Sequence, residues 1–438
     1  GTVRSEASAK CWIDERAIDG SNEVYTPTPY QASARSWTPE PAVWAEIQRR
    51  SVERPVTLTF AGVSRDDARA PRSRGSVTFT TSRDEVGAPI FYRDVPLMPS
   101  IAPETGVIRP LAPEVTPLIE WRLRDVTRPE SKVILTGMRT CANCHSFSRD
   151  GRTMGLDVDS AEGDKGGYAI VPLDRETAIE PEHLFTWNSF RDRPEERRTI
   201  GFLSRISPDG RHAVTTLNES IYAASFMDHR FLQVFFVTRG SLAWVSADTH
   251  EIRILPGADD PEYVHCNPVW TPDGRTIVFA RARAFDPPTD KDALARYPND
   301  PREPQIRFDL YRMPFDEGRG GVPVPIEGAS HNGMSNTFPK VSPDGRFVVF
   351  TQCRNAQLLR PDGRLRIVPL GGGESREMRC NTPLMNSWHS FSPNGRWMVF
   401  SSKCNTPYTQ LFLTHVDAEG NDTPAILIPN STAANRAA

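Results

Sequence analysis

Residues 141–145 read Cys-Ala-Asn-Cys-His, which places two thiols three residues apart and an imidazole directly after the second thiol. Thiols at this spacing can reach the two vinyl groups on one edge of a porphyrin, and the adjacent imidazole can turn onto its iron. The pattern therefore predicts one covalently bound haem c. Cys141 and Cys144 would form the thioether bonds, and His145 would be the proximal axial ligand.

Two other interpretations of the same residues remain open, a redox-active thiol pair and a partial metal site. A thioredoxin-like CxxC pair opens a helix within a βαβ unit, and the surrounding sequence predicts no such unit. A zinc site needs a second pair of ligands, and the chain contains no second CxxC and no HxxxH. Covalent haem is the interpretation that uses all three side chains.

The CxxCH motif resembles that of the c-type cytochromes, and this resemblance implies maturation outside the cytoplasmic membrane. We therefore expect a periplasmic or extracellular protein whose signal peptide is absent from this chain, which begins with Gly rather than Met. Electron transfer would require redox partner proteins, and the N-terminal arm and the large repeat surface suggest that the chain is a subunit of a larger assembly.

A turn that recurs along the chain predicts the β-strands that must position this motif. Each copy has the form Ser/Thr-x-Asp/Asn-Gly-Arg and precedes a run of β-forming residues. Proline presets φ, Asp or Asn caps the turn and Gly accepts positive φ, so each copy predicts a β-hairpin. The five copies are Ser148–Gly151, Ser207–Gly210, Thr271–Gly274, Ser342–Gly345 and Ser392–Gly395.

These repeats resemble the TolB-like or WD40-like (PD40 repeat) β-propeller, and Trp270-Thr-Pro-Asp-Gly274 is the nearest copy of its turn. The resemblance covers roughly residues 138–430 and implies an all-β propeller over 131–438 with five or six blades. Strands such as Pro117–Arg124 would complete a sixth blade.

Residues 1–130 predict a mostly extended, β-rich N-terminal extension. Residues 25–41 are rich in proline and read as an extended arm. A short helix is expected over Ala42–Ser51 with Thr38 as its N-cap. Three strands are expected after it, at Val56–Val63, Ser76–Ser82 and Pro89–Val95.

The repeats also suggest the distal iron ligand. His145 and His389 each lie six residues before a turn glycine, and both begin the string His-Ser-Phe-Ser. That position starts the innermost strand of a blade, and in a five-bladed ring the two blades would be neighbours. His389 is the candidate distal ligand, with a buried structural histidine as the competing interpretation. Met334 and Met385, in loops that enter inner strands, are the alternative ligands.

Composition excludes other classes of partner. The net charge of −3 and the pI near 6.4 argue against nucleic acid, and no apolar run reaches the length of a transmembrane segment. The acidic stretch from Asp157 to Asp164 could hold calcium, but its spacing does not match an EF-hand loop, so a solvated hairpin is favoured.

Electron transfer through a propeller-bound haem is the function that these features favour. One alternative is a haem-dependent redox enzyme acting on a small molecule, since propeller haem proteins that process small nitrogen compounds resemble this combination. The other is a TolB-like binding module in which the haem is structural. No Ser-His-Asp arrangement or phosphate-binding loop is recognisable.

Overall fold

The structure is a computed structural model. It describes residues 28–33, 37–64, 70–95, 119–128, 130–137, 144–159, 164–190, 199–226, 231, 233–405, 409–429 and 435–437. The chain divides into two compact units, one containing residues 26–87 and the other containing residues 88–438. No helix in the described part is long and apolar enough to span a membrane.

The first unit contains two helices and a β-hairpin. Its elements are α1 (Pro29–Ser33), α2 (Pro41–Ser51), β1 (Val56–Val63) and β2 (Pro71–Phe79), and the two strands pair antiparallel. The expected helix is present, but Thr38 is not its cap: Glu40 occupies the N-cap without a side-chain hydrogen bond, because Pro41 begins the helix. α1 lies within the stretch expected to be extended.

The second unit consists of antiparallel sets of four strands. In chain order the sets are β6–β9 (His145–Phe147, Thr153–Val158, Gly167–Pro172, Leu184–Thr186), β10–β13 (Phe202–Ile206, His212–Ser225, Gln233–Ser246, Ile252–Ile254), β14–β17 (Tyr263–Trp270, Thr276–Arg283, Asp309–Pro314, Val324–Pro325), β18–β21 (Ser335–Val341, Phe347–Cys353, Arg364–Pro369, Arg376–Glu377) and β22–β25 (Asn386–Phe391, Trp397–Ser402, Gln410–His415, Ile426–Leu427). A single parallel bridge between Gly240 and Val264 joins β10–β13 and β14–β17 into one eight-stranded sheet. Short 3₁₀ helices lie at Pro181–His183, Trp187–Ser189, Lys291–Ala293 and Asp316–Gly318.

A further sheet joins distant parts of the chain. It has the order β26-β3-β4-β5, with strands at Asn435–Ala437, Ile90–Val95, Glu120–Arg124 and Ser131–Leu135. Trp121 of this sheet packs with Met154 and Leu156 of β7, and β26 contacts β24. The sheet therefore packs beside the sheet that carries His145, and its strand β26 contacts the sheet that carries His389.

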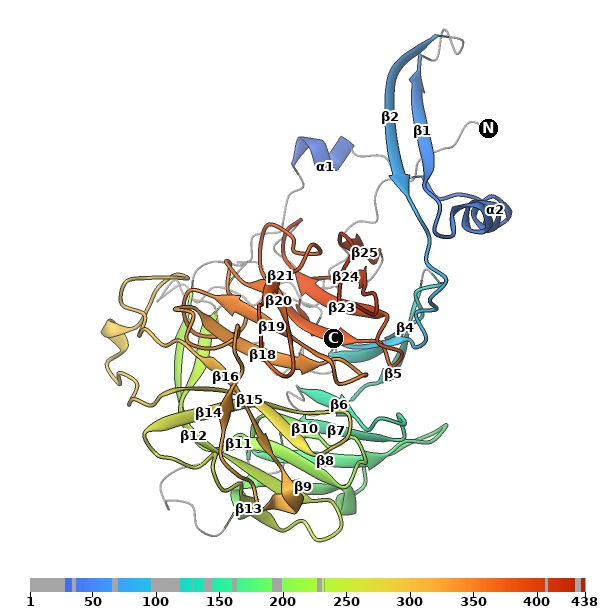
Figure 1. Ribbon diagram of the computed structural model, residues 1–438. Helices are drawn as coiled ribbons and strands as arrows, with labels where there is room; N and C mark the ends of the chain where they lie inside the picture. Colours follow the sequence, from blue (N-terminus) through green and yellow to red (C-terminus); the bar gives the residue numbers. More distant parts are fainter. Residues whose placement is uncertain are drawn as a thin grey trace. The chain divides into compact units, whose positions relative to one another are not determined.

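The first strands of successive sheets contact one another in the order β6, β10, β14, β18 and β22. Figure 1 shows the sheets following one another from green through yellow to red as the chain proceeds. This arrangement is propeller-like and confirms the predicted all-β class.

The predicted turns join the first and second strands of these five sets. Their glycines have φ between 69° and 76°, a region that other residues rarely adopt. In the second copy, Asp209 Oδ1 accepts from Ser207 Oγ at 2.5 Å and from the main-chain N–H of Arg211 at 3.0 Å. The residue types that predicted the turns therefore form them.

A β-bulge interrupts four of the first strands at one common position. The residue seven places before the turn glycine has positive φ in each, and the strand register shifts there. These residues are Leu203, Asn267, Phe338 and Trp388. Such bulges change the direction of side chains near the start of a strand, where Cys144 and His145 lie in the first repeat.

Candidate functional site

Cys144 and His145 lie at the start of β6, the first strand of its sheet. The main-chain N–H of Asp157 donates to the carbonyl of Cys144 at 2.9 Å, and His145 pairs with Leu156. Cys141 is outside the described residues. The structure therefore places His145 as the first residue of β6 and Cys144 directly before it.

The imidazole of His145 is half-buried beside aromatic rings and cations. Its ring centroid is 4.6 Å from that of Phe91 and 6.1 Å from that of Phe147, both in edge-to-face arrangements. Burial, reinforced by Arg205 and Lys340, lowers the pKa of His145 to about 3. Nδ1 is buried and has no hydrogen-bond partner within the described part of the chain. The ring is therefore neutral at physiological pH, which is the state that binds metals.

Cys144 lies beside Asp157 in the same interior region. Burial and the neighbouring carboxylate raise the pKa of the Cys144 thiol to about 12. Burial likewise raises the pKa of Asp157 to about 8, against the opposing effects of Ser204 and Arg205. A thiol whose pKa is raised in this way is protonated at neutral pH and is a poor nucleophile.

Two cations complete the cluster, and the sequence reasoning missed both. Arg205 Nη1 donates to the carbonyl of His145 at 2.5 Å. The Arg205 guanidinium carbon lies 5.7 Å, and Lys340 Nζ 5.4 Å, from the ring centroid of Phe338. Burial and the charge of Arg205 hold the pKa of Lys340 well below its usual value.

The alignment of the repeats contains the pattern from which these two cations could have been identified. Arg205 and Lys340 each lie five residues before a turn glycine, a position that holds Ser146, Val269 or Ser390 in the other copies. Because first strands surround a common centre, cations at this position meet there.

His389 lies within the bulge of β22 and is completely buried. Its Nε2 is 2.9 Å from the carbonyl oxygen of Val349, and its ring stacks edge-to-face on Phe338 with centroids 5.6 Å apart. Burial lowers its pKa to about 3, with Lys340 and Arg205 contributing. Nδ1 is buried without a partner within the described residues. His145 and His389 thus share the same two cations, while ligation of iron by His389 stays a prediction.

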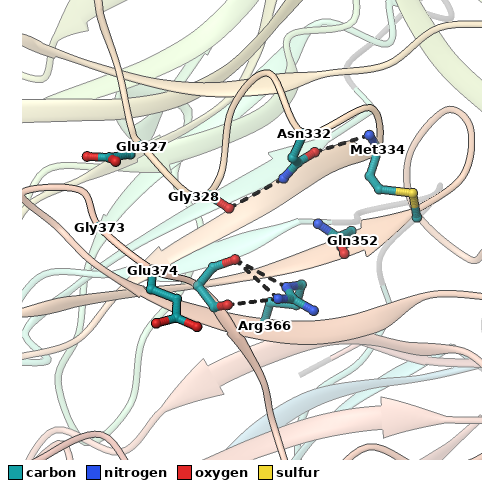
Figure 2. A pocket seen from close by; sticks show the side chains of 9 residues that line it. Glu327, Gly328, Asn332, Met334, Gln352, Arg366, Gly373 and Glu374 are labelled. Carbon is teal, nitrogen blue, oxygen red and sulfur yellow. Dashed lines mark hydrogen bonds between the residues drawn. The ribbon is translucent and has the colours of Figure 1, made fainter.

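The two methionines have different surroundings. Met385 is completely buried in the largest apolar cluster, against which Cys144 also packs. Met334 lines a surface pocket of about 490 Å³. In Figure 2 its main-chain N–H donates to Asn332 Oδ1 at 3.1 Å, and Arg366 lies across the pocket. Both remain predicted alternatives for the distal ligand.

The described residues contain no group of three or more His, Cys, Asp or Glu side chains that could hold a metal ion. Residues 160–163 of the acidic stretch after Asp157 lie outside the described part, so calcium binding there stays untested.

Comparisons with known proteins give weak similarities in structure alone. No protein-family model matches the chain, and no curated protein matches it. TolB from Acinetobacter baumannii aligns with a TM-score of 0.44 at 15% identity, over 79% of this chain and 66% of that one. A protein described as TolB from Agrobacterium tumefaciens aligns with a TM-score of 0.42 at 16% identity, over 69% of this chain and 85% of that one. Hydrazine synthase from Kuenenia stuttgartiensis aligns with a TM-score of 0.38 at 13% identity, over 67% and 76% of the two chains.

Proposed function

We propose that this protein is an extracytoplasmic mono-haem c-type cytochrome that transfers electrons. The observation that carries the proposal is the position of the CxxCH motif. Its histidine begins an inner strand, is held neutral by burial, and has a buried ring nitrogen without a partner in the described part of the chain. These properties suit an imidazole that binds iron.

The residues present fit a covalently bound haem. Cys141 and Cys144 would hold it and His145 would ligate the iron, while the bound haem would supply the one-electron redox chemistry. The rings of Phe91 and Phe147 pack edge-to-face with the His145 ring and so fix its orientation. Arg205 binds the main chain of His145 and places a positive charge next to the motif, which favours the reduced state of a redox group bound there.

Production of the full chain with the c-type maturation machinery tests the proposal. We expect mass spectrometry of the denatured protein to show one covalently bound haem. In Cys141→Ser and in Cys144→Ser we expect loss of the absorption spectrum of a haem with two thioether bonds. Cys404→Ser removes a half-buried thiol elsewhere and should leave the adduct intact. Wild-type protein without covalent haem would overturn the proposal.

Electron transfer is separated from the other haem functions by two measurements on the loaded protein. Reversible potentiometric cycling with slow or absent cyanide binding is expected of an electron carrier. Fast, tight cyanide binding would instead indicate an enzyme with an open iron position. A haem that cannot be cycled would leave a binding module with structural haem.

We also propose that the propeller has six blades, the higher of the two counts that the repeats allow. The support is that six sets of four strands can be counted if the eight-stranded sheet is divided at its single bridge. Redox partner proteins, with which this chain would form a larger assembly, belong to the same proposal.

A further inference from the structure

A second hollow, of about 370 Å³, lies where β14 and β16 begin and β15 ends. It is lined by cationic and aromatic side chains, chiefly Tyr263, Arg281, Arg283, Arg307, Tyr311 and His331. We propose that it binds a small organic anion carrying two or more carboxylate or phosphate groups. The proposal does not depend on haem binding.

The positive charge of the hollow exceeds its negative charge. Three arginines and one aspartate line it, in a protein whose net charge is −3. Arg307 is exposed and forms no hydrogen bond or ion pair with any described residue. Its planar guanidinium offers the paired donors that carboxylate and phosphate oxygens accept.

Arg281 is the fixed part of the site. Its guanidinium carbon lies 3.7 Å from the ring centroid of Tyr263 and 5.3 Å from that of Tyr311, and its side chain is only 15% exposed. Among the described residues its ionic contact is to Asp260, and at 3.4 Å it is long. Nε is buried and has no partner within the described ranges. A rigid arginine with an unused donor is preorganised for an anionic ligand.

The acidic groups near these arginines are already engaged. Asp309 Oδ2 lies 3.2 Å from His331 Nδ1, and Asp309 Oδ1 accepts from the main-chain N–H of His331 at 2.7 Å. Glu262 pairs with Arg283 at 2.5 Å, but both side chains are more than half exposed, so that pair is weak. An incoming anion therefore competes with solvent-exposed contacts at Arg283 and with none at Arg307.

The tyrosines supply neutral donors. Neither Tyr263 nor Tyr311 has a hydrogen bond from its hydroxyl within the described part of the chain, so both are available to a ligand. The concave shape and the volume suit a small molecule better than a flat protein surface.

Calorimetric titration of the full chain with citrate and with glycerol 3-phosphate, at constant ionic strength, tests the proposal. We expect saturable one-site binding of at least one anion, and none of glycerol. A preference for citrate would identify carboxylates as the ligand class, and a preference for glycerol 3-phosphate would identify phosphate esters. Absence of binding by both anions would overturn the proposal.

Variants locate the binding. Arg307→Ala should weaken it about 10-fold, because it removes one charge-assisted contact to the anion from a residue that has no hydrogen bond or ion pair with any described residue. Arg175→Ala removes an exposed charge from the loop after β8 and should leave the affinity unchanged. Equal weakening in both variants, or none in Arg307→Ala and in Arg281→Lys, would refute the assigned site.

Discussion

The guanidinium of Arg360 and the carboxylate of Glu303 form a buried, bidentate ion pair. Nη1 lies 2.6 Å from Oε1 and Nη2 3.1 Å from Oε2, and the side chains are 2% and 0% exposed. Asn299 Oδ1 accepts a further hydrogen bond from Nη2 at 2.7 Å. The pair therefore fastens the long connection between β15 and β16 to the loop between β19 and β20.

Breaking this pair should destabilise the protein strongly. Arg360→Met leaves the Glu303 carboxylate buried without its cation, so we expect the free energy of unfolding to fall by about 3–5 kcal/mol in urea denaturation. Arg253→Ala is the control, since Arg253 pairs with Glu251 on the surface and both are 57% exposed. The control should change stability by no more than about 0.5 kcal/mol, and an equally small effect of Arg360→Met would contradict the prediction.

Replacing a turn glycine should cost stability through backbone conformation alone. Gly345 has φ of 75°, and a Cβ added there would meet nothing closer than Pro272 at 4.0 Å. Gly345→Ala should therefore lower the free energy of unfolding by about 1–2 kcal/mol, the strain of a left-handed alanine. At Gly371 a Cβ meets nothing within 4 Å and φ is not positive, so Gly371→Ala should not destabilise. Similar losses in thermal unfolding of the two variants would contradict this assignment.

Acid should destabilise the fold partly through His265. This side chain is completely buried, and burial, with Arg281 nearby, lowers its pKa from 6.5 to about 4. The unfolded chain then binds the proton more tightly, so stability falls as pH drops from about 6.5 to about 4. The full contribution is on the order of 3 kcal/mol.

The measurement compares the wild type with His265→Asn by urea denaturation across this pH range. The difference between their free energies of unfolding should shrink as pH falls, and should be constant above about pH 7. A difference that does not change with pH would show that His265 takes no part in the acid response.

The distal iron ligand is tested on the haem-loaded protein by absorption spectroscopy of the reduced state. His389→Ala should convert the low-spin spectrum to high spin if the histidine binds iron. Met334→Ala and Met385→Leu test the alternatives, the first at a surface pocket and the second in the apolar core. An unchanged spectrum in His389→Ala removes this residue as a ligand.

Local features of the fold were predictable from sequence because turn chemistry is local. The Ser-Pro-Asp-Gly turns use side-chain bonds between residues no more than five positions apart, so each turn and the β-forming run after it could be located. The pairing of Asn435–Ala437 with Arg93–Val95 could not, since nothing in a strand of three residues specifies a partner more than 300 residues away.

The candidate site likewise contains residues that the sequence identifies and residues that only the fold brings together. The CxxCH motif is contiguous, so Cys144 and His145 were identifiable directly. Arg205 and Lys340 become neighbours only when separate sheets surround one centre, and their sequence context is that of ordinary strand residues. Two arginines of the anion hollow lie on β15 and the third lies in the long connection to β16, so their convergence also depends on the tertiary fold.

The pairing of β26 with β3 also bears on the order of folding. β3 and β4 are synthesised early, yet their sheet lacks its first strand until residue 437 has left the ribosome. The nascent chain therefore carries an unpaired strand edge while the more than 300 residues between β4 and β26 are synthesised, and non-local pairing of this kind forms slowly. Until β26 covers it, this edge is open to pairing with another chain.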